Sequence, residues 1–453
     1  MSTSASHPPS VAARLEAVDL TTMPRYIQHG YPWADWDLLR EVAPVYRYGS
    51  RARFDPFWAV TRYDDVRYVS SHPETFSNTG VVRLDTIRGL AALENYRRRR
   101  AERHGWDPDE PLDLVYTDRP LHLDLRSMAV RRFTPRAMNH LADHLDELAA
   151  GFVAEFVEHA RRVAPEPLDL VEHLSVGLPL ATICGLLGVP TGDWPTIHRW
   201  SDQTLLPPDM NHPDVRPGET PADVRRRAGQ EYHEYRQGLI DRARLRAAAA
   251  AQADGQTVDD FDLLTVLASA TIDGAPLDDQ RFHGYVELLV GGGNETTRNT
   301  ITGGVRALLE HPDQATRFAA DPTGLAETAA EEILRWVSPV IQFARTATVD
   351  TELGGQPIAA GDTVVLWYPS ANRDERHFAD PYRFDIGRHP NSHVAFGHGN
   401  HFCLGANLAR WELRAVFRAL APHLVRLELA GEPERMPGLH VGAVRRQLVR
   451  WVD

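Results

Sequence analysis

The stretch Phe396-Gly-His-Gly-Asn-His-Phe-Cys-Leu-Gly405 holds the residues on which the prediction of the fold depends. Its three glycines allow a tight backbone that can lie close to a flat ligand. Cys403 stands at the start of a predicted helix over 404–420, where the helix dipole and free N–H groups lower the pKa of a thiol. The stretch therefore predicts a reactive or metal-ligating thiolate.

Three kinds of site use a cysteine in such surroundings. A thiolate on haem iron needs a close backbone and donors to the sulfur, and both are predicted here. A zinc site would use His398, His401 and Cys403, but their spacing is poor for tetrahedral coordination and no second cysteine pair completes the set. A hydrolase would use Cys403 as its nucleophile, but nothing else in the sequence points to one. The haem-thiolate interpretation is favoured.

The composition narrows the class of protein further. The chain has 453 residues, 43% of them hydrophobic, and a formal net charge of -13, which disfavours nucleic acid as the main partner. All 49 basic residues are arginine, which excludes a lysine Schiff base and a lysine-containing phosphate loop. Length alone suggests about three domains.

Targeting signals are not expected. No run of eighteen apolar residues appears, so no membrane anchor is predicted. Met1–Ser10 is polar, which predicts no export, and residues 1–20 are interpreted as a flexible tail. With two cysteines, a disulfide framework is not expected, and Cys184 in an apolar run is predicted to be a buried core thiol. We expect a cytoplasmic protein.

The hydrophobic periodicity predicts a mainly helical chain with a small strand region. Residues 80–110 are expected to be irregular and charged, and Arg97–Arg100 to be a solvated helix face rather than a binding patch. Strands are predicted over 45–48, 57–61, 343–348 and 363–368; helices over 121–250 with a break at 207–221, from 278 or 279 to 310, and over 404–420.

The 396–405 stretch resembles the cysteine-loop signature of cytochromes P-450, Phe-Gly-x-Gly-x-His-x-Cys-x-Gly, at every fixed position. The resemblance extends over about residues 35–450. It implies the cytochrome P-450 fold, mainly α with a small β region, in one large domain over 21–453. It also implies that Cys403 is the axial ligand of haem b, that Phe396 packs near the sulfur, and that Gly405 belongs to the haem-binding loop.

Glu332-Ile-Leu-Arg335 resembles the Glu-x-x-Arg helix motif of this family. A spacing of three puts both side chains on one helix face, which alone indicates only a surface ion pair. Phe384-Asp-Ile-Gly-Arg388 resembles the segment that carries the third member of a Glu-Arg-Arg network. The resemblance implies that Glu332, Arg335 and Arg388 brace the cysteine loop, although Ile386 stands where many relatives have proline.

Gly292-Gly-Asn-Glu-Thr-Thr297, within the long predicted helix, resembles the oxygen-binding motif of the family. Glycines inside a helix cost about 1 kcal/mol each, so Gly291–Gly293 indicate either a local opening or a close helix contact. The resemblance implies that Glu295 supplies protons and Thr296 supports a hydrogen-bond network around dioxygen. In the alternative, Thr296 bonds to a helix carbonyl and Glu295 pairs with Arg298.

His122-Leu-Asp-Leu-Arg126 resembles the His-x-x-x-Arg pair that holds a haem propionate. A spacing of four puts both side chains on one helix face, and two cations suit a carboxylate. By the same resemblance, Arg345 and His393 are further propionate partners. Each of these four residues taken alone fits an ordinary surface position.

The resemblance implies a monomeric monooxygenase that uses dioxygen and two electrons. No flavin or iron–sulfur segment is recognised, so a separate ferredoxin and its NAD(P)H-dependent reductase are expected as donors. Their docking face is predicted around Arg131, Arg132, Arg136, Arg410 and Arg414. A peroxide-driven peroxygenase and a non-enzymatic haem sensor are the alternatives; the first lacks an acid–threonine pair in known relatives, and the second needs an output domain.

The substrate is predicted to be a bulky lipophilic molecule such as a terpenoid, a steroid or a fatty chain, with a polyketide intermediate as the alternative. The reason is that the predicted pocket walls are apolar. They come from the 80–117 segment and from Leu289, Val290, Gly292, Val340, Ile341 and Val441.

Overall fold

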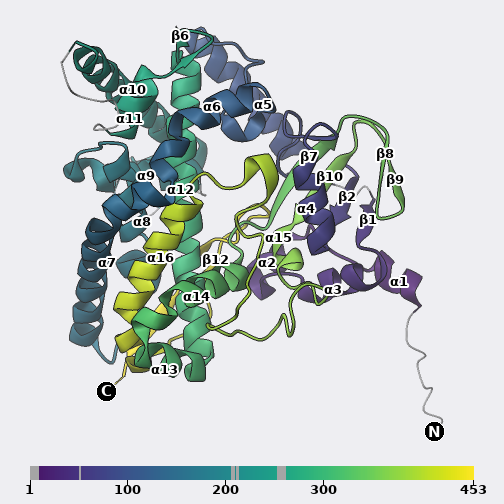
Figure 1. The fold of residues 1–453 in the computed structure, drawn as a ribbon, viewed down its shortest axis with the longest axis vertical. Coiled ribbons are helices and arrows are strands. Elements are labelled where there is room, and N and C mark those ends of the chain that lie inside the picture. The colour runs from purple at the N-terminus through teal and green to yellow at the C-terminus, as the bar shows by residue number, and fades with distance from the viewer. Residues whose placement is uncertain (1–9, 50–52, 206–209, 211–213, 253–261, 453) are drawn as a thin grey trace.

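The long predicted helix is the axis of the structure. In the computed structural model, which describes residues 10–49, 53–205, 210, 214–252 and 262–452, α12 (Asp279–Glu310) runs through the middle of the helical part (Figure 1). The side chain of Asp278 caps it by accepting the N–H of Arg281 at 2.8 Å, and Pro312 follows its end. Its 32 residues span about 48 Å, which confirms the prediction at both ends.

Helices make up most of the described chain, and α8, α10, α14 and α16 are among those that pack against α12. The α-helices besides α12 are α1 (Val11–Glu16), α2 (Met23–His29), α3 (Trp33–Val42), α4 (Tyr63–Ser71), α5 (Ile87–His104), α6 (Leu121–Val130), α7 (Pro135–Val163), α8 (Gly177–Leu186), α9 (Trp194–Leu205), α10 (Pro221–Ala250), α11 (Leu263–Ser269), α13 (Pro312–Ala320), α14 (Pro322–Val337), α15 (Tyr368–Ala371) and α16 (Ala406–Leu420). Short turns of tighter or wider helix are η1 (Leu114–Tyr116), η2 (Arg131–Phe133), η3 (Val171–Ser175), η4 (Thr191–Asp193), η6 (Gly399–His401) and η7 (Ala421–Arg426).

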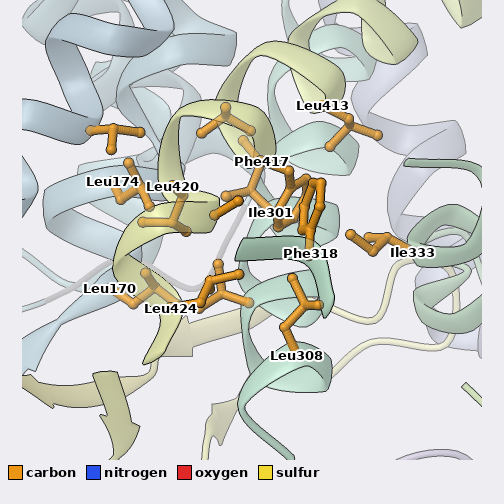
Figure 2. Packing of buried hydrophobic residues seen from close by; sticks show 14 of the residues in the cluster. Leu170, Leu174, Ile301, Leu308, Phe318, Ile333, Leu413, Phe417, Leu420 and Leu424 are labelled. Carbon is orange, nitrogen blue, oxygen red and sulfur yellow. The ribbon is translucent and has the colours of Figure 1, made fainter. Parts of the chain in front are cut away.

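The main hydrophobic core lies where α12, α14 and α16 meet. Ile301 and Phe417 are fully buried there (Figure 2). A Cβ on Gly304 would come within 2.5 Å of the Phe417 ring, so the two helices approach as closely as they do only because residue 304 is glycine. This packing fixes the position of α16, which begins directly after the cysteine loop.

Strands form a smaller lobe beside the helices (Figure 1). The five-stranded sheet has the order β1-β2-β10-β7-β3, with β2 and β10 parallel and the other pairs antiparallel. Val364 of β10 pairs with Arg345 of β7, which sets the register of the two inner strands. The strands are β1 (Val45–Tyr48), β2 (Phe57–Val60), β3 (Phe76–Ser77), β4 (Leu168–Asp169), β5 (Thr271–Ile272), β6 (Ala275–Pro276), β7 (Gln342–Ala347), β8 (Thr351–Leu353), β9 (Gln356–Ile358), β10 (Thr363–Trp367), β11 (Leu427–Leu429), β12 (Glu434–Arg435), β13 (Val444–Arg446) and β14 (Leu448–Trp451).

The structure differs from the sequence prediction at residues 10–20, which had been assigned to a flexible tail. They begin with α1, and Val18 and Leu20 are 0% exposed in the core of the sheet lobe beside Trp36 and Trp367. Two apolar side chains held in a core keep this segment against the lobe. Residues 1–9 of that assignment lie outside the described residues, and the single domain over 21–453 stays a prediction.

A second difference concerns residues 80–110, where the helix α5 replaces the expected irregular segment. Thr86 caps the helix by accepting the N–H of Gly89 at 2.9 Å, and Gly105 ends it with a φ of 67°. Arg100, expected in a solvated face, lies over the Trp106 ring at 4.9 Å and pairs with Glu287 of α12 at 3.1 Å. The helix is anchored by residues outside it, Trp106 just after its end and Glu287 of α12, which is why its own charged sequence did not indicate it.

Three further predictions concern the break before α10, the thiol of Cys184 and the absence of a membrane anchor. The expected break at 207–221 falls largely on residues outside those described, and α10 begins at Pro221. Cys184 is 0% exposed, and burial raises the pKa of its thiol to about 12, which confirms the core thiol. Among the described residues, no helix combines the length and apolar character needed to cross a membrane.

Candidate functional site

The cysteine loop turns sharply between α15 and α16. Gly399 has a φ of 72°, and a Cβ there would lie 2.1 Å from the carbonyl oxygen of Ser70, so only glycine fits this approach to α4. The N–H of Cys403 donates to the carbonyl oxygen of Phe396 at 2.9 Å, which closes the loop. The side chain of Cys403 is exposed. The loop thus presents its sulfur at an open face.

The electrostatics of Cys403 correct the sequence argument. Loss of solvation raises the pKa of the thiol, and it outweighs the N–H of Gly405 and the charges of Arg126 and Arg410, all of which lower it. The side chain is exposed, but many atoms of the chain lie around the sulfur and limit its solvation, which is why the pKa is raised. The helix terminus alone therefore does not give a low pKa. A bound metal ion ionises a coordinating thiol outright.

Glu332 and Arg335 form a buried pair at the expected spacing, and both side chains are 0% exposed. Arg335 donates from Nε and Nη2 to the two carboxylate oxygens of Glu332, each at 2.8 Å. Arg388 lies 3.2 Å from Oε2 and donates to Oε1 at 3.3 Å. The N–H of Asp385 and the amide of Asn391 also donate to this carboxylate, at 2.9 and 3.0 Å. Every part of the Glu332 carboxylate is therefore hydrogen-bonded.

The buried pair is connected to the segment that leads into the cysteine loop. Arg335 donates to the carbonyl oxygen of Asn372 at 2.9 Å, and the Asn372 side chain accepts the N–H of Val394 at 2.8 Å. Asn391, bonded to Glu332, lies three residues before Val394 in the same segment. Two asparagines that the sequence analysis missed thus connect the pair to the backbone before Phe396. A single asparagine carries no spacing signal by which it could be found.

Three of the four predicted propionate partners lie close to the cysteine loop and form no ion pair within the described part of the chain. Arg345 is 4% exposed, donates to the carbonyl oxygen of Ala344 at 2.8 Å and bonds the Tyr368 side chain. The buried Nε2 of His122 has no hydrogen-bond partner, and burial, assisted by Arg126, lowers the pKa of this imidazole to about 4. Arg126 interacts electrostatically with Cys403.

His393, the fourth predicted partner, has neighbours of its own. Its Nδ1 accepts the N–H of Ala395 at 3.2 Å, and its Nε2 lies 3.2 Å from a carboxylate oxygen of Glu331. Arg410 donates to the same carboxylate at 2.7 Å and lies 4.7 Å over the Phe396 ring. The structure thus brings His393 and Phe396 to the loop but pairs His393 with an acid. Its role toward a propionate stays a prediction.

These residues fit a haem group. A buried guanidinium without an ion-pair partner and a buried imidazole nitrogen without a hydrogen-bond partner are costly unless a ligand satisfies them, and carboxylates such as two propionates supply what is missing. The exposed sulfur of Cys403 lies near Arg126, and its predicted role as the thiolate ligand fits this arrangement. Among the described residues no three His, Cys, Asp or Glu side chains converge as metal ligands. The zinc alternative is therefore not supported.

The middle of α12 carries the predicted oxygen-binding residues. Arg298 donates to Oε2 of Glu295 at 2.9 Å, and the Thr296 hydroxyl donates to the carbonyl oxygen of Gly292 at 2.8 Å. These are the contacts expected if Glu295 and Thr296 serve only to stabilise the helix. However, the Oε1 atom of Glu295 is buried without a partner, and burial raises the pKa of this carboxyl. One half of the carboxylate is thus left for a further donor.

The glycines of α12 were predicted to mark either a local opening or a close helix contact, and two of them differ in this respect. The helix stays continuous through Gly291–Gly293. A Cβ on Gly293 would lie 3.4 Å from Ile183 of α8, whereas a Cβ on Gly292 would meet nothing within 4 Å. Gly293 therefore serves close helix packing, and Gly292 borders open space next to Thr296. Asn294 follows them fully buried, and both its amide oxygen and its amide nitrogen lack a partner.

The predicted pocket residues are only partly brought together. Val340 and Val441 form an isolated β-bridge and are partly exposed. Leu289 and Val290 lie in the core between α6, α8 and α10. Ile341 is 0% exposed in the core of the sheet lobe, on a different side from Val340. A strand alternates its faces, so neighbouring residues cannot both line one wall.

Asp202 of α9 is a further residue that the sequence analysis missed. Its carboxylate lies 3.5 Å from Arg298, whose other partner is Glu295. The charge of Asp202 adds to the raised pKa of Glu295. No motif marks Asp202, because its contact with α12 depends on how two distant helices pack.

Comparison with known proteins agrees with this geometry. The family model described as Cytochrome P450 matches residues 325–430. A methyl-branched lipid omega-hydroxylase of Mycobacterium bovis is 37% identical over 87% of this chain and 84% of its own length. A steroid C26-monooxygenase of the same organism is 36% identical over 92% of this chain and 88% of its own. The chain belongs to the cytochrome P450 family. It is a P450 monooxygenase, and haem is its cofactor.

The fold agrees as well. A cytochrome P450 of Mycobacterium marinum, CYP268A2 in complex with pseudoionone, superposes with a TM-score of 0.78. It is 32% identical, and the match covers 99% of this P450 and 100% of that chain. The P450 fold predicted from the cysteine loop, mainly α with a small β region, is therefore confirmed.

Proposed function

We propose that this P450 hydroxylates or epoxidises a lipophilic molecule with a long aliphatic part, using dioxygen and electrons from a separate ferredoxin and its NAD(P)H-dependent reductase. The observation that carries the proposal is the exposed sulfur of Cys403 close to Arg126 and to the loop that Arg345 approaches, two arginines that form no ion pair among the described residues. The names of two relatives, a methyl-branched lipid omega-hydroxylase and a steroid C26-monooxygenase, support the substrate class.

Cys403 would bind the haem iron, and His122, Arg126, Arg345 and His393 would hold the propionates. When bound, haem supplies the iron at which dioxygen is reduced and one oxygen atom passes to the substrate. Phe396 and Gly405 would shape the surroundings of the sulfur, and the N–H of Gly405 favours the thiolate. Glu332, Arg335 and Arg388 would keep the loop in place through Asn372 and Asn391.

Glu295 and Thr296 would deliver protons. Burial raises the pKa of the Glu295 carboxyl, which brings it closer to the working pH of a proton donor. Arg298 holds one oxygen of Glu295 while the other has no partner, so the carboxyl keeps a free acceptor for water. Thr296, half-exposed next to the open side of Gly292, can turn its hydroxyl from the Gly292 carbonyl toward that water.

The electron donor would dock around Arg131, Arg132, Arg136, Arg410 and Arg414. In the structure, Arg410 pairs with Glu331 at 2.7 Å and Arg414 lies 3.5 Å from Glu327. Arg131 and Arg136 are exposed on α7 and the turn before it. These two exposed arginines would attract an acidic ferredoxin over a range that shrinks with salt. A Glu substitution at Arg131 should slow reduction by ferredoxin but leave substrate binding unchanged.

The sulfur is tested with the reduced holoenzyme and carbon monoxide. Cys403→Ser should abolish the strongly red-shifted Soret band of thiolate ligation, whereas the matched variant Cys184→Ser should retain it. Retention of the band in Cys403→Ser would overturn the assignment.

Turnover of a fatty chain is then compared with surrogate ferredoxin and reductase and with peroxide alone. Thr296→Ala should still consume NAD(P)H but release peroxide instead of product, and Glu295→Gln should enlarge the solvent deuterium effect. Product formed only with peroxide would favour a peroxygenase. Wild-type product yield in both variants would contradict the proton-delivery role.

A further inference from the structure

Arg83 lies at a bend in the short segment 81–85 beside β7, and it has no part in the proposed haem site or proton delivery. The N–H of Ala344 donates to the carbonyl oxygen of Val82 at 2.7 Å. The side-chain amide of Gln342 bonds the N–H and the carbonyl oxygen of Leu84, at 3.2 and 3.3 Å. Arg83 is therefore held between two fixed residues at the edge of the five-stranded sheet, next to Phe343.

The neighbours of Arg83 show which way its side chain faces. Ala344 is buried in the core of the sheet lobe. Phe343 and Arg345 precede and follow Ala344 on β7 and so face the opposite side. His440 packs against Phe343 on that side, and Arg83 lies close enough to His440 to act on its imidazole. It is the side that carries Arg345, the proposed propionate partner, and thus the side toward the haem and the substrate.

Three titratable side chains interact with Arg83. His440 stacks edge-on against Phe343 with ring centroids 4.8 Å apart, and burial together with Arg83 lowers the pKa of its imidazole to about 4. Burial raises the pKa of the Tyr116 phenol. Burial also raises the pKa of the Asp113 carboxyl to about 7, because the N–H of Val115 and the charges of Arg83 and Arg100 offset it only in part. Of these three neighbours only Asp113 carries negative charge near neutral pH, and it is then only partly ionised.

Arg83 has no hydrogen bond and no ion pair within the described part of the chain, although it is half-buried. The nearby carboxylate of Asp85 is already engaged, since it accepts the N–H of Thr86 at 2.7 Å. A half-buried guanidinium without a protein acceptor keeps its N–H groups for a ligand, and a carboxylate accepts two of them side by side. Arg83 therefore has the charge, the donors and the burial of an anion-binding group.

We propose that Arg83 binds the carboxylate of a lipophilic acid, so that oxidation falls on carbons remote from that carboxylate. This inference rests on the proposed function and names its substrate class. Val340 and Val441 pair directly beside His440 and offer apolar contact to the start of the chain. The anchor distinguishes an acid from an alcohol or ester of the same length, because only the acid carries the charge.

The test measures binding to the holoenzyme by titration calorimetry, with hexadecanoic acid and hexadecan-1-ol as probes below their critical micelle concentrations. Wild-type protein should bind the acid about tenfold to a hundredfold more tightly than the alcohol, as for a charge-assisted pair. Arg83→Gln should remove this preference by weakening the acid alone, and Arg83→Lys should restore part of it. Arg88→Gln, an exposed arginine on α5, is the matched control and should keep the preference.

Each other outcome counts against the proposal in its own way. Equal binding of acid and alcohol to the wild type would overturn the anchor while leaving a lipophilic substrate in place. No binding of either probe would overturn the lipid substrate class and the anchor with it. If Arg83→Gln instead speeds haem transfer to apo-globin and keeps the acid preference, Arg83 is a haem contact, and the anchor is wrong.

Discussion

Two buried glutamate–arginine pairs in this P450 have the same spacing but differ in how far they are satisfied. In α14, Glu332 accepts bonds from two arginines, a backbone N–H and an asparagine amide. In α12, Glu295 receives Arg298 on one oxygen and nothing on the other. Both pairs join residues three apart on one helix face.

The difference indicates what each pair does. A saturated buried network is rigid, since no lone pair is left for a competing partner. A half-satisfied carboxyl with a raised pKa can exchange partners and protons at small cost. The first pair lies on the cysteine side of the molecule and fixes a loop. The second lies beside Gly292 and Thr296, where protons have to move.

The largest effect is expected from Glu332→Gln. It leaves Arg335 buried without a counter-charge, which should lower the free energy of unfolding by about 3–5 kcal/mol. Glu295→Gln should cost only about 1 kcal/mol, because Arg298 keeps Asp202 as a partner. Urea unfolding of the haem-free chains measures both. Similar losses in the two variants would mean that the number of hydrogen bonds to the glutamate does not distinguish the structural pair in α14 from the proton-delivering pair in α12.

The next effect concerns a buried cation that lacks an anion. Arg345→Gln should leave the unfolding free energy of the haem-free protein unchanged or higher, since burial already lowers the pKa of Arg345. It should weaken haem retention by about 2–5 kcal/mol if the propionate site is desolvated. Haem transfer to apo-globin measures retention, with the exposed Arg450 replaced by Gln as control. Unchanged transfer would remove Arg345 from the haem site.

A third buried glutamate, Glu412 of α16, has no cation among its neighbours in the described residues. Burial raises its pKa to about 8, with a hydrogen bond from Thr182 acting against this. The folded chain then holds a proton that the unfolded chain releases above its ordinary pKa of 4.5. Stability from this group is present at low pH and is lost as the pH rises toward 8, by about 1.4 kcal/mol per pH unit.

Glu412→Gln should therefore flatten the stability profile between pH 5 and 8. Its control, Glu327→Gln, changes a carboxylate whose side chain is 75% exposed and should keep the wild-type slope. Unfolding midpoints in urea at several pH values give both profiles. Parallel profiles for wild type and Glu412→Gln would show that Glu412 is already ionised at neutral pH.

The sequence predicted those features that depend on local signals. Asp278 and Pro312 mark the ends of α12, and the glycines, Cys403 and Glu332–Arg335 follow fixed spacings. It did not indicate α5, because Arg100 is stabilised by Trp106 and Glu287 rather than by its own helix. The spacing of three in Glu332–Arg335 and Glu295–Arg298 is identical, so the sequence could not show which pair is saturated.

The missed site residues share one physical cause. Asn372, Asn391 and Asp202 act through bonds to residues more than twenty positions away, and such partners leave no periodic pattern. The expected low pKa of Cys403 failed for a related reason. The helix terminus and the nearby arginines were foreseeable from the sequence. The loss of solvation that outweighs them comes from atoms that the folded chain brings around the sulfur.

The smallest effect, and the sharpest test of the comparison, is expected from Asp202→Asn. Asp202 lies 3.5 Å from Arg298 and competes with Glu295 for it, and its own charge also raises the pKa of Glu295. Removing that charge should bind Arg298 more firmly to Glu295 and lower the pKa of Glu295. The interaction is partly exposed to solvent and worth about 0.2–1 kcal/mol, which corresponds to about 0.2–0.7 pH units.

The pH at which product per NAD(P)H falls to half on the alkaline side should therefore move down by that amount, because Glu295 loses its proton earlier. Glu327→Gln, at a side chain 75% exposed on α14, should not move it. An unshifted profile in Asp202→Asn would mean that Glu295 is held by Arg298 as firmly as Glu332 is held by Arg335, and the contrast between the two pairs would then be one of hydrogen-bond number alone.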